Sequence, residues 1–227
     1  MNKAVSISKG IGILLMVIGH AGCPNYMRSF IYVFHMPLFF FLSGYCFKER
    51  YFSEPRTFLL KRIKGLYLPY IKYALLFLLL HNMFFYLNIY NGEYGFNGKA
   101  SFIYTFKDFL VRGFNIITRM TDSEQLLGGF WFLKQLLLAS IIGFFTIRLF
   151  NRKGVVVLII ITYILLWTNI YIPFWGINWL SFLSASFFVI GYNFSKVKKV
   201  SHPLLCMIFS LLQNQISHML ITIKTVF

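Results

Sequence analysis

Residues 9–20 read KGIGILLMVIGH and, after a short break, residues 30–45 read FIYVFHMPLFFFLSGY. Each of these two apolar runs carries one histidine, His20 in the first and His35 in the second. Eleven residues separate Lys9 from His20, which is about three turns of an α-helix and a rise of roughly 16 Å, so the two side chains share one face. Ionisable side chains in apolar segments are costly in lipid and usually face a bundle interior or a wet cavity. The stretch therefore predicts two antiparallel helices that hold His20 and His35 beside one cavity.

Composition predicts a membrane protein with several spans. The chain has 227 residues, of which 58% are hydrophobic, 20% aromatic and only 12% charged, whereas soluble domains average about 25% charged residues. Its net charge of +16 comes from 22 Lys and Arg residues against 6 Asp and Glu residues. Because the basic residues stand between apolar runs, membrane topology explains them better than nucleic-acid binding does. We expect a lipid bilayer as partner and no nucleic acid, and the oligomeric state stays open.

The pattern of apolar runs predicts an all-α transmembrane helix bundle of about seven spans, forming a single domain over residues 1–227. The expected spans are 10–26, 30–47, 66–90, 130–149, 155–174, 177–194 and 203–223. A basic loop, 48–65, and the basic links after the fourth and sixth spans place those segments and the N-terminus in the cytoplasm. The long stretch 91–128 then lies outside. Its amphipathic part either forms an interfacial helix that roofs the cavity or is a solvated loop.

The cysteines predict no chemistry. Cys23, Cys46 and Cys206 are scattered, odd in number and without metal-ligand or redox spacing, so they are expected to be apolar packing residues, and no metal site is expected. The first apolar run is expected to be a retained span rather than a cleaved signal peptide, because further apolar segments follow it.

Four pieces, in order, carry a resemblance to a known family. They are Lys9-Gly10 with His20 after ten spacers, Phe34-His35-Met36-Pro37 through Ser43-Gly44-Tyr45, Lys61-Arg62-Ile63-Lys64 through Pro69-Tyr70, and Trp131-Phe132-Leu133. Together they resemble the acyltransferase-3 family of integral-membrane O-acyltransferases, especially its fucose 4-O-acetylase-like branch. The chain departs from the family pattern at Ser6, where an acidic residue is common, and at Gly65, where a second arginine is usual.

The resemblance implies a reaction and a place for it. An acetyl or short acyl group would pass from cytoplasmic acetyl-CoA, a co-substrate rather than a bound cofactor, to a hydroxyl of a cell-surface carbohydrate or a lipid-linked glycan. The membrane would be the bacterial cytoplasmic (inner) membrane. His20 would be the essential catalytic residue and Lys9 its basic partner. Because family members usually have more spans, the chain is expected to lack the C-terminal ones.

Acyl transfer to an alcohol needs a base, and a neutral imidazole suits that task near pH 7. The oxyanion of the tetrahedral intermediate needs hydrogen-bond donors, for which His35, Ser43 and Trp131 are the candidates. Phosphates of CoA need cations, and the expected ones stand at the basic entry to the third span. They are Lys61, Arg62 and Lys64.

Each of these residues also has a structural explanation. Intramembrane histidines often pack helices together. The positive-inside rule alone would explain Lys61, Arg62 and Lys64, and Trp131 suits a membrane–water interface. His81 and Asn82, mid-way along the third span, are expected to hydrogen-bond across helices. Two alternatives to the enzyme stay open: a small multispan transporter or permease with His20 and His35 in a proton or substrate path, and an inactive truncated acyltransferase fragment.

Overall fold

The computed structural model describes residues 3–90, 102–121, 124–172 and 174–196. Within these ranges the chain is helical, and the one β feature is an isolated bridge between Ile172 and Ile177. The all-α prediction is confirmed. The expected seventh span, 203–223, lies outside the described residues.

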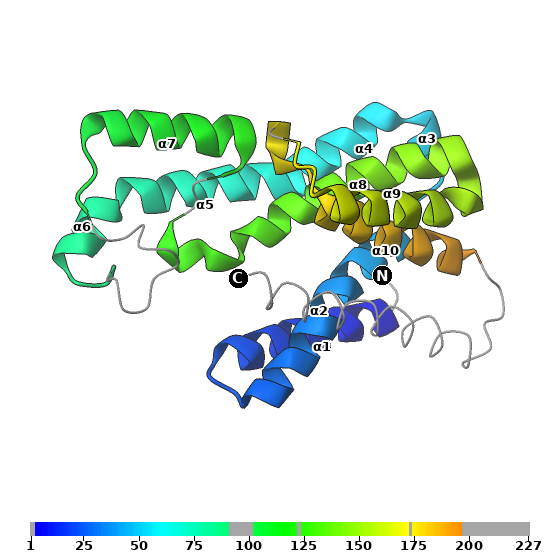
Figure 1. Cartoon of the computed structure of the whole chain (residues 1–227), viewed down its shortest axis with the longest axis horizontal. Coiled ribbons are helices and arrows are strands. Elements are labelled where there is room, and N and C mark those ends of the chain that lie inside the picture. The colour runs from blue at the N-terminus through cyan, green and yellow to red at the C-terminus, as the bar shows by residue number, and fades with distance from the viewer. Residues whose placement is uncertain (1–2, 91–101, 122–123, 173, 197–227) are drawn as a thin grey trace.

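Helix α10 (Trp179–Ser195) is the centre of the bundle. It packs against α2 (Asn25–Tyr45), α8 (Trp131–Phe150) and α9 (Gly154–Thr168), as Figure 1 shows. Two glycines allow α2 and α10 to approach closely, since a Cβ on Gly44 would collide with the carbonyl oxygen of Phe188 and one on Gly191 with that of Phe41. Small residues are typical of close helix contacts in membranes.

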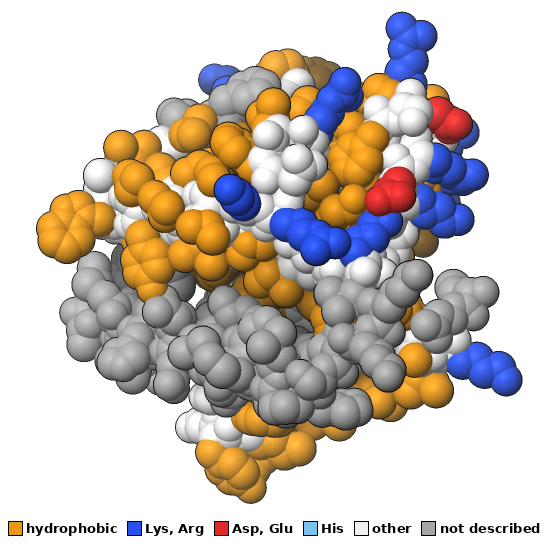
Figure 2. Space-filling view, turned by 90° about the vertical axis from the view of Figure 1, so that its right-hand side faces the viewer, with side chains coloured by type: hydrophobic (Ala, Val, Ile, Leu, Met, Phe, Trp, Pro, Cys, Tyr) orange, Lys and Arg blue, Asp and Glu red, His pale blue; other side chains and the backbone are white. Residues whose placement is uncertain are grey.

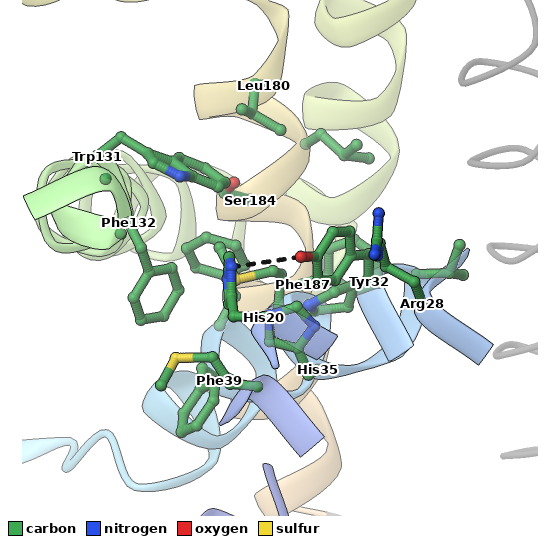
Figure 3. A pocket seen from close by; sticks show the side chains of 18 of the residues that line it. His20, Arg28, Tyr32, His35, Phe39, Trp131, Phe132, Leu180, Ser184 and Phe187 are labelled. Carbon is green, nitrogen blue, oxygen red and sulfur yellow. Dashed lines mark hydrogen bonds between the residues drawn. The ribbon is translucent and has the colours of Figure 1, made fainter. Parts of the chain in front are cut away.

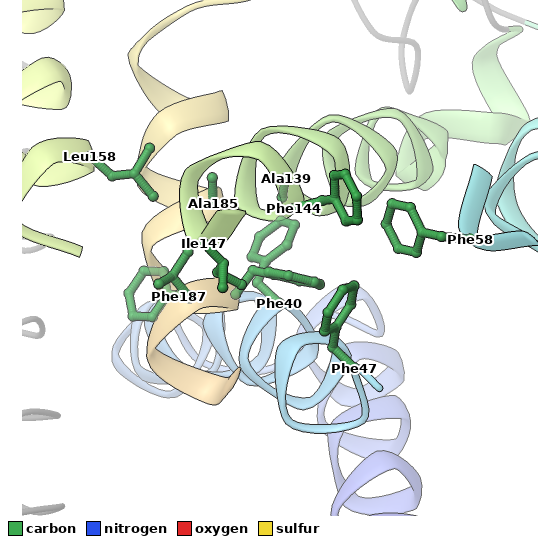
Figure 4. Packing of buried hydrophobic residues seen from close by; sticks show 11 residues of the cluster. Phe40, Phe47, Phe58, Ala139, Phe144, Ile147, Leu158, Ala185 and Phe187 are labelled. Carbon is green, nitrogen blue, oxygen red and sulfur yellow. The ribbon is translucent and has the colours of Figure 1, made fainter. Parts of the chain in front are cut away.

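An aromatic core fills the space between these helices. Its largest members come from α2, the segment that follows it, α4 (Pro55–Arg62), α8 and α10. They are Phe40, Phe47, Phe58, Phe144, Phe187 and Phe188, and most are labelled in Figure 4. Phe58 and Phe144 stack with ring centroids 5.0 Å apart, so this core attaches α4 to the α8–α10 layer.

Helix α1 (Lys3–His20) packs along α2 and ends earlier than predicted. The expected span 10–26 is wrong at its C-terminal end, because Gly22 adopts a left-handed φ of 84° and Pro24 follows it. The residue before a proline disfavours helical geometry. His20 therefore lies at the C-terminal end of α1, beside the turn into α2, rather than inside a longer span.

The segment predicted to be a basic loop, 48–65, is largely helical. It contains α3 (Arg50–Ser53) and α4, which continues through a π-helical turn (Ile63–Tyr67) into α5 (Leu68–Leu79) and α6 (His81–Tyr86). Proline in the first turn favours the start of α4. The loop prediction missed that cations of α4 lie over aromatic rings. The Arg62 guanidinium, for example, lies 5.3 Å from the centroid of the Phe58 ring.

The stretch 91–128, which was expected to lie outside, contains an amphipathic helix, α7 (Phe106–Arg119). It begins with a capping box in which Thr105 and Asp108 bond each other's backbone N–H groups, and it packs against α5. The helical alternative for this segment is therefore confirmed. Residues 91–101 lie outside the described part.

The seven-span count is not confirmed. Two described segments are long and apolar enough to cross a membrane, Lys3–His20 and Gln125–Thr168, the latter joining α8 and α9. Of the other described helices, α2 is long enough with 21 residues but is less apolar, and α10 has 17 residues, whereas a span needs about 20. Many large apolar side chains are nevertheless exposed, and Figure 2 shows them over much of one face, with Lys and Arg side chains gathered on part of it.

Candidate active site

A cavity of about 740 Å³ lies between α1, α2, α8 and α10. We call it the histidine cavity, and Figure 3 shows its lining. Most of that lining is apolar or aromatic, as ligand pockets usually are, with a few polar groups that converge. The polar and indole-bearing members are His20, Arg28, Tyr32, His35, Trp131, Trp179 and Ser184.

Tyr32 stands between the two histidines. Its hydroxyl lies 3.4 Å from Nδ1 of His20 and donates to the carbonyl oxygen of Gly19 at 3.2 Å. Its ring centroid is 5.4 Å from that of His20 and 5.6 Å from that of His35. The predicted proximity of His20 and His35 beside one cavity is therefore confirmed, with Tyr32 as the link that the sequence reasoning missed.

The backbone fixes the tautomer of His35. Its Nδ1 lies 2.7 Å from the carbonyl oxygen of Ile31, and because a carbonyl only accepts, Nδ1 carries the proton. In the neutral ring Nε2 then carries no proton, and its lone pair can accept a hydrogen bond or a proton. This favours contact with a substrate hydroxyl over the oxyanion-donor role predicted from the sequence. His20, by contrast, is exposed at the end of α1.

A second cavity of about 380 Å³ lies beside the first, and we call it the basic cavity. Its polar lining comes from α1, α2, the 46–51 segment and α4, and comprises Lys9, Ser43, Cys46, Tyr51, Lys61 and Arg62. The buried Ser43 hydroxyl has no hydrogen-bond partner among the described residues. Phe39 lines both cavities, and its ring packs on Phe132 at a centroid distance of 5.6 Å.

The family model described as an acyltransferase domain matches residues 2–213. The chain belongs to the acyltransferase-3 family. It is thus a membrane acyltransferase in general terms, which favours the enzyme over the transporter alternative. The comparison with curated proteins and the comparison with solved structures gave no match.

The structure divides the predicted site residues of this acyltransferase into two groups. His20, His35 and Trp131 line the histidine cavity, and Lys9, Ser43, Lys61 and Arg62 line the basic cavity. Lys64 is exposed and lines neither. Lys9 and His20 therefore share a helix face but not a cavity, and their catalytic roles stay predictions.

Sequence reasoning missed three polar residues of the histidine cavity, Arg28, Tyr32 and Ser184. Arg28, Tyr32 and His35 follow an i, i+4, i+7 spacing on α2, which places them on one face, so this signal was available. Ser184 gave no signal, because it is one of four serines along α10 and its position does not distinguish it from the others. Its hydroxyl is unpartnered among the described residues, and its side chain is 1% exposed.

A buried polar cluster away from both cavities links neighbouring segments of the chain. His81 is 0% exposed, with Nδ1 2.7 Å from Oε2 of Glu124 and Nε2 3.1 Å from the carbonyl oxygen of Phe102. Asn82 bonds both backbone groups of Tyr104. These residues join α6 to the segments that flank α7, so they form hydrogen bonds as predicted, but with connecting segments rather than across to another helix.

No residue of α7 lines either cavity, so the predicted roof is wrong. Helix α7 instead packs on α5. Among the described residues no group of His, Cys, Asp and Glu side chains is placed to hold a metal ion.

Proposed function

We propose that this acyltransferase moves an acetyl or short acyl group from acyl-CoA to a hydroxyl of a cell-surface carbohydrate or lipid-linked glycan. It would act in the bacterial cytoplasmic membrane, with several spans and a cytoplasmic N-terminus. The observation that carries the proposal is the pair of cavities that share Phe39 in a chain of this family. One holds cations and the other holds two imidazoles.

The basic cavity is where acyl-CoA binds in this proposal. Lys9, Lys61 and Arg62 supply cations for its phosphates, and guanidinium groups bind phosphate with two parallel hydrogen bonds. Aromatic contacts fix two of these cations, since Nζ of Lys61 lies 3.3 Å from the Tyr51 hydroxyl and Arg62 lies over the ring of Phe58. The Ser43 hydroxyl, which has no hydrogen-bond partner in the described part of the chain, can contact the ligand.

The histidine cavity takes the acceptor hydroxyl. His20, neutral, accepts the hydroxyl proton while the acceptor oxygen forms a bond to the thioester carbonyl carbon. The carbon–sulfur bond then breaks, and the CoA sulfur leaves with the proton from the imidazolium. His35 accepts a second hydrogen bond from the acceptor through Nε2, and the Trp131 indole N–H is the candidate donor to the oxyanion.

The test is transfer of label from radioactive acetyl-CoA to glycan in membrane vesicles that contain the intact chain. His20→Gln is expected to lower the rate at least a hundredfold, since a general base contributes about 10²–10⁴. Arg119→Gln, at an exposed position that lines neither cavity, is the control, and its rate should equal that of the unaltered chain.

Equal insertion of all three proteins is verified by protease accessibility. An undiminished transfer rate in the His20 variant would show that His20 is not the general base. No transfer by the intact, inserted chain would overturn the enzyme proposal for this chain and support the alternative of an inactive fragment.

A further inference from the structure

The histidine cavity contains a cation that the reaction so far does not use. Arg28 is the one Lys, Arg, Asp or Glu among its described lining residues. Its guanidinium is half-buried, and its hydrogen bond from Nη2 to the carbonyl oxygen of Cys23 is long, at 3.4 Å. Figure 3 shows Arg28 beside Tyr32, on the same side of the cavity as His35.

No described carboxylate neutralises Arg28. Of the four acidic residues in the described ranges, Glu124 bonds His81, Glu49 bonds Lys196, Asp108 caps α7 and Glu54 is exposed before α4. None of them lies within ion-pair distance of Arg28 in the described part of the chain. Burying a charge without a partner is costly.

Helix stability does not account for Arg28 either. It lies in the first turn of α2, because its backbone N–H bonds the carbonyl oxygen of Pro24. A cation there is opposed by the helix dipole. A residue that faces a cavity, opposes the dipole and has no counter-ion among the described residues suits the binding of an anionic ligand.

We propose that Arg28 forms a subsite for an oxyanion carried by the acceptor, either a sugar carboxylate or a phosphate ester. Arg28 lies two turns before His35 on α2, with Tyr32 between them, so the anion would bind roughly 10 Å from the His35 imidazole along the helix axis. That separation fits an anionic group on the same sugar as the reacting hydroxyl or at the next linkage. The buried, unpartnered hydroxyl of Ser184 offers a second polar contact in this cavity.

The inference uses the proposed function only in naming the ligand as the acceptor, so its test measures binding rather than transfer. Trp131 and Trp179 line the cavity, and their fluorescence reports ligands there. The full chain in nanodiscs of neutral lipid is titrated with methyl glucoside, methyl glucuronoside and glucose 1-phosphate. These probes are a neutral sugar, a carboxylate and a phosphate ester.

We expect at least one anionic probe to bind about tenfold or more tightly than methyl glucoside, the usual effect of a hydrogen bond to a charged group. Arg28→Gln should abolish that preference, and Arg28→Lys should retain part of it, because lysine keeps the charge without the planar fork. Arg119→Gln, an exposed arginine that lines neither cavity, should keep the full preference.

Equal binding of all three probes by the unaltered chain, or an undiminished preference in Arg28→Gln, would overturn the subsite. A preference for the carboxylate alone or the phosphate alone identifies which source supplies the anion. The vesicle transfer assay is run in parallel on the same proteins. An intact binding preference without transfer would refute the proposed reaction and leave the subsite standing.

Discussion

Tyr32→Phe tests whether the link between the histidines positions the proposed base. The substitution removes the hydroxyl and keeps the ring that lies 5.4 Å from His20 and 5.6 Å from His35. Two contacts are lost, one to His20 Nδ1 at 3.4 Å and one to the Gly19 carbonyl oxygen at 3.2 Å. Both distances are long, so each contact belongs at the weak end of the usual 0.5–1.5 kcal/mol.

The expected loss in kcat is therefore about two- to tenfold, which corresponds to roughly 0.5–1.4 kcal/mol of barrier. KM for acetyl-CoA should not change, because Tyr32 does not line the basic cavity. The assay is initial-rate acetyl transfer in vesicles with varied acetyl-CoA. Tyr26→Phe, on the same helix and 79% exposed, is the matched control and should be unaffected.

Two results would refute this reasoning. A loss beyond a hundredfold would show that the Tyr32 hydroxyl contacts the reacting atoms itself, because a positioning bond is too weak to cause it. A rate equal to that of the unaltered chain would show that ring packing alone holds His20.

Three further predictions concern donor binding, packing and pH. Arg62→Gln should raise KM for acetyl-CoA about tenfold or more through the lost charged contact, whereas Lys64→Gln, at an exposed position outside both cavities, should not change it in the same kinetic assay. Gly44→Ala should lower the unfolding free energy by about 1–3 kcal/mol, measured by denaturation in detergent, since its Cβ collides with the Phe188 carbonyl. Burial raises the pKa of Glu124 above its ordinary 4.5, so its contribution to stability is complete below pH 4.5 and is lost as pH rises through the raised value. The thermal stability of the unaltered chain should therefore fall relative to Glu124→Gln over that range, and parallel pH profiles would contradict this.

The sequence predicted the fold class and the α1–α2 hairpin because both follow from the periodicity and extent of apolar runs. It placed helix ends poorly at two points for local reasons. Gly22 and Pro24 end α1 early, and the cations of 48–65 looked like a solvated loop because charge alone does not show that Arg62 lies over Phe58.

The sequence predicted most of the residues of the candidate site, but not their division between two cavities. His20 and His35 were placed together correctly, since a short turn between antiparallel helices brings them to similar depth. Arg28 could have been assigned from its spacing to Tyr32 and His35 on α2, whereas Ser184 could not. Ser184 lies on α10, a helix whose neighbours are set by tertiary packing.

The grouping into two cavities gives the spacing between Lys9 and His20 a physical meaning. Eleven residues on α1 place these side chains on one face but about 16 Å apart, and the structure places Phe39 between the cavities that they line. In the proposed reaction phosphates bind at the Lys9 end and the proton is taken at the His20 end. The pantetheine arm of acyl-CoA must then pass Phe39, so the interval on α1 measures the distance between donor recognition and chemistry rather than a direct contact between base and cation.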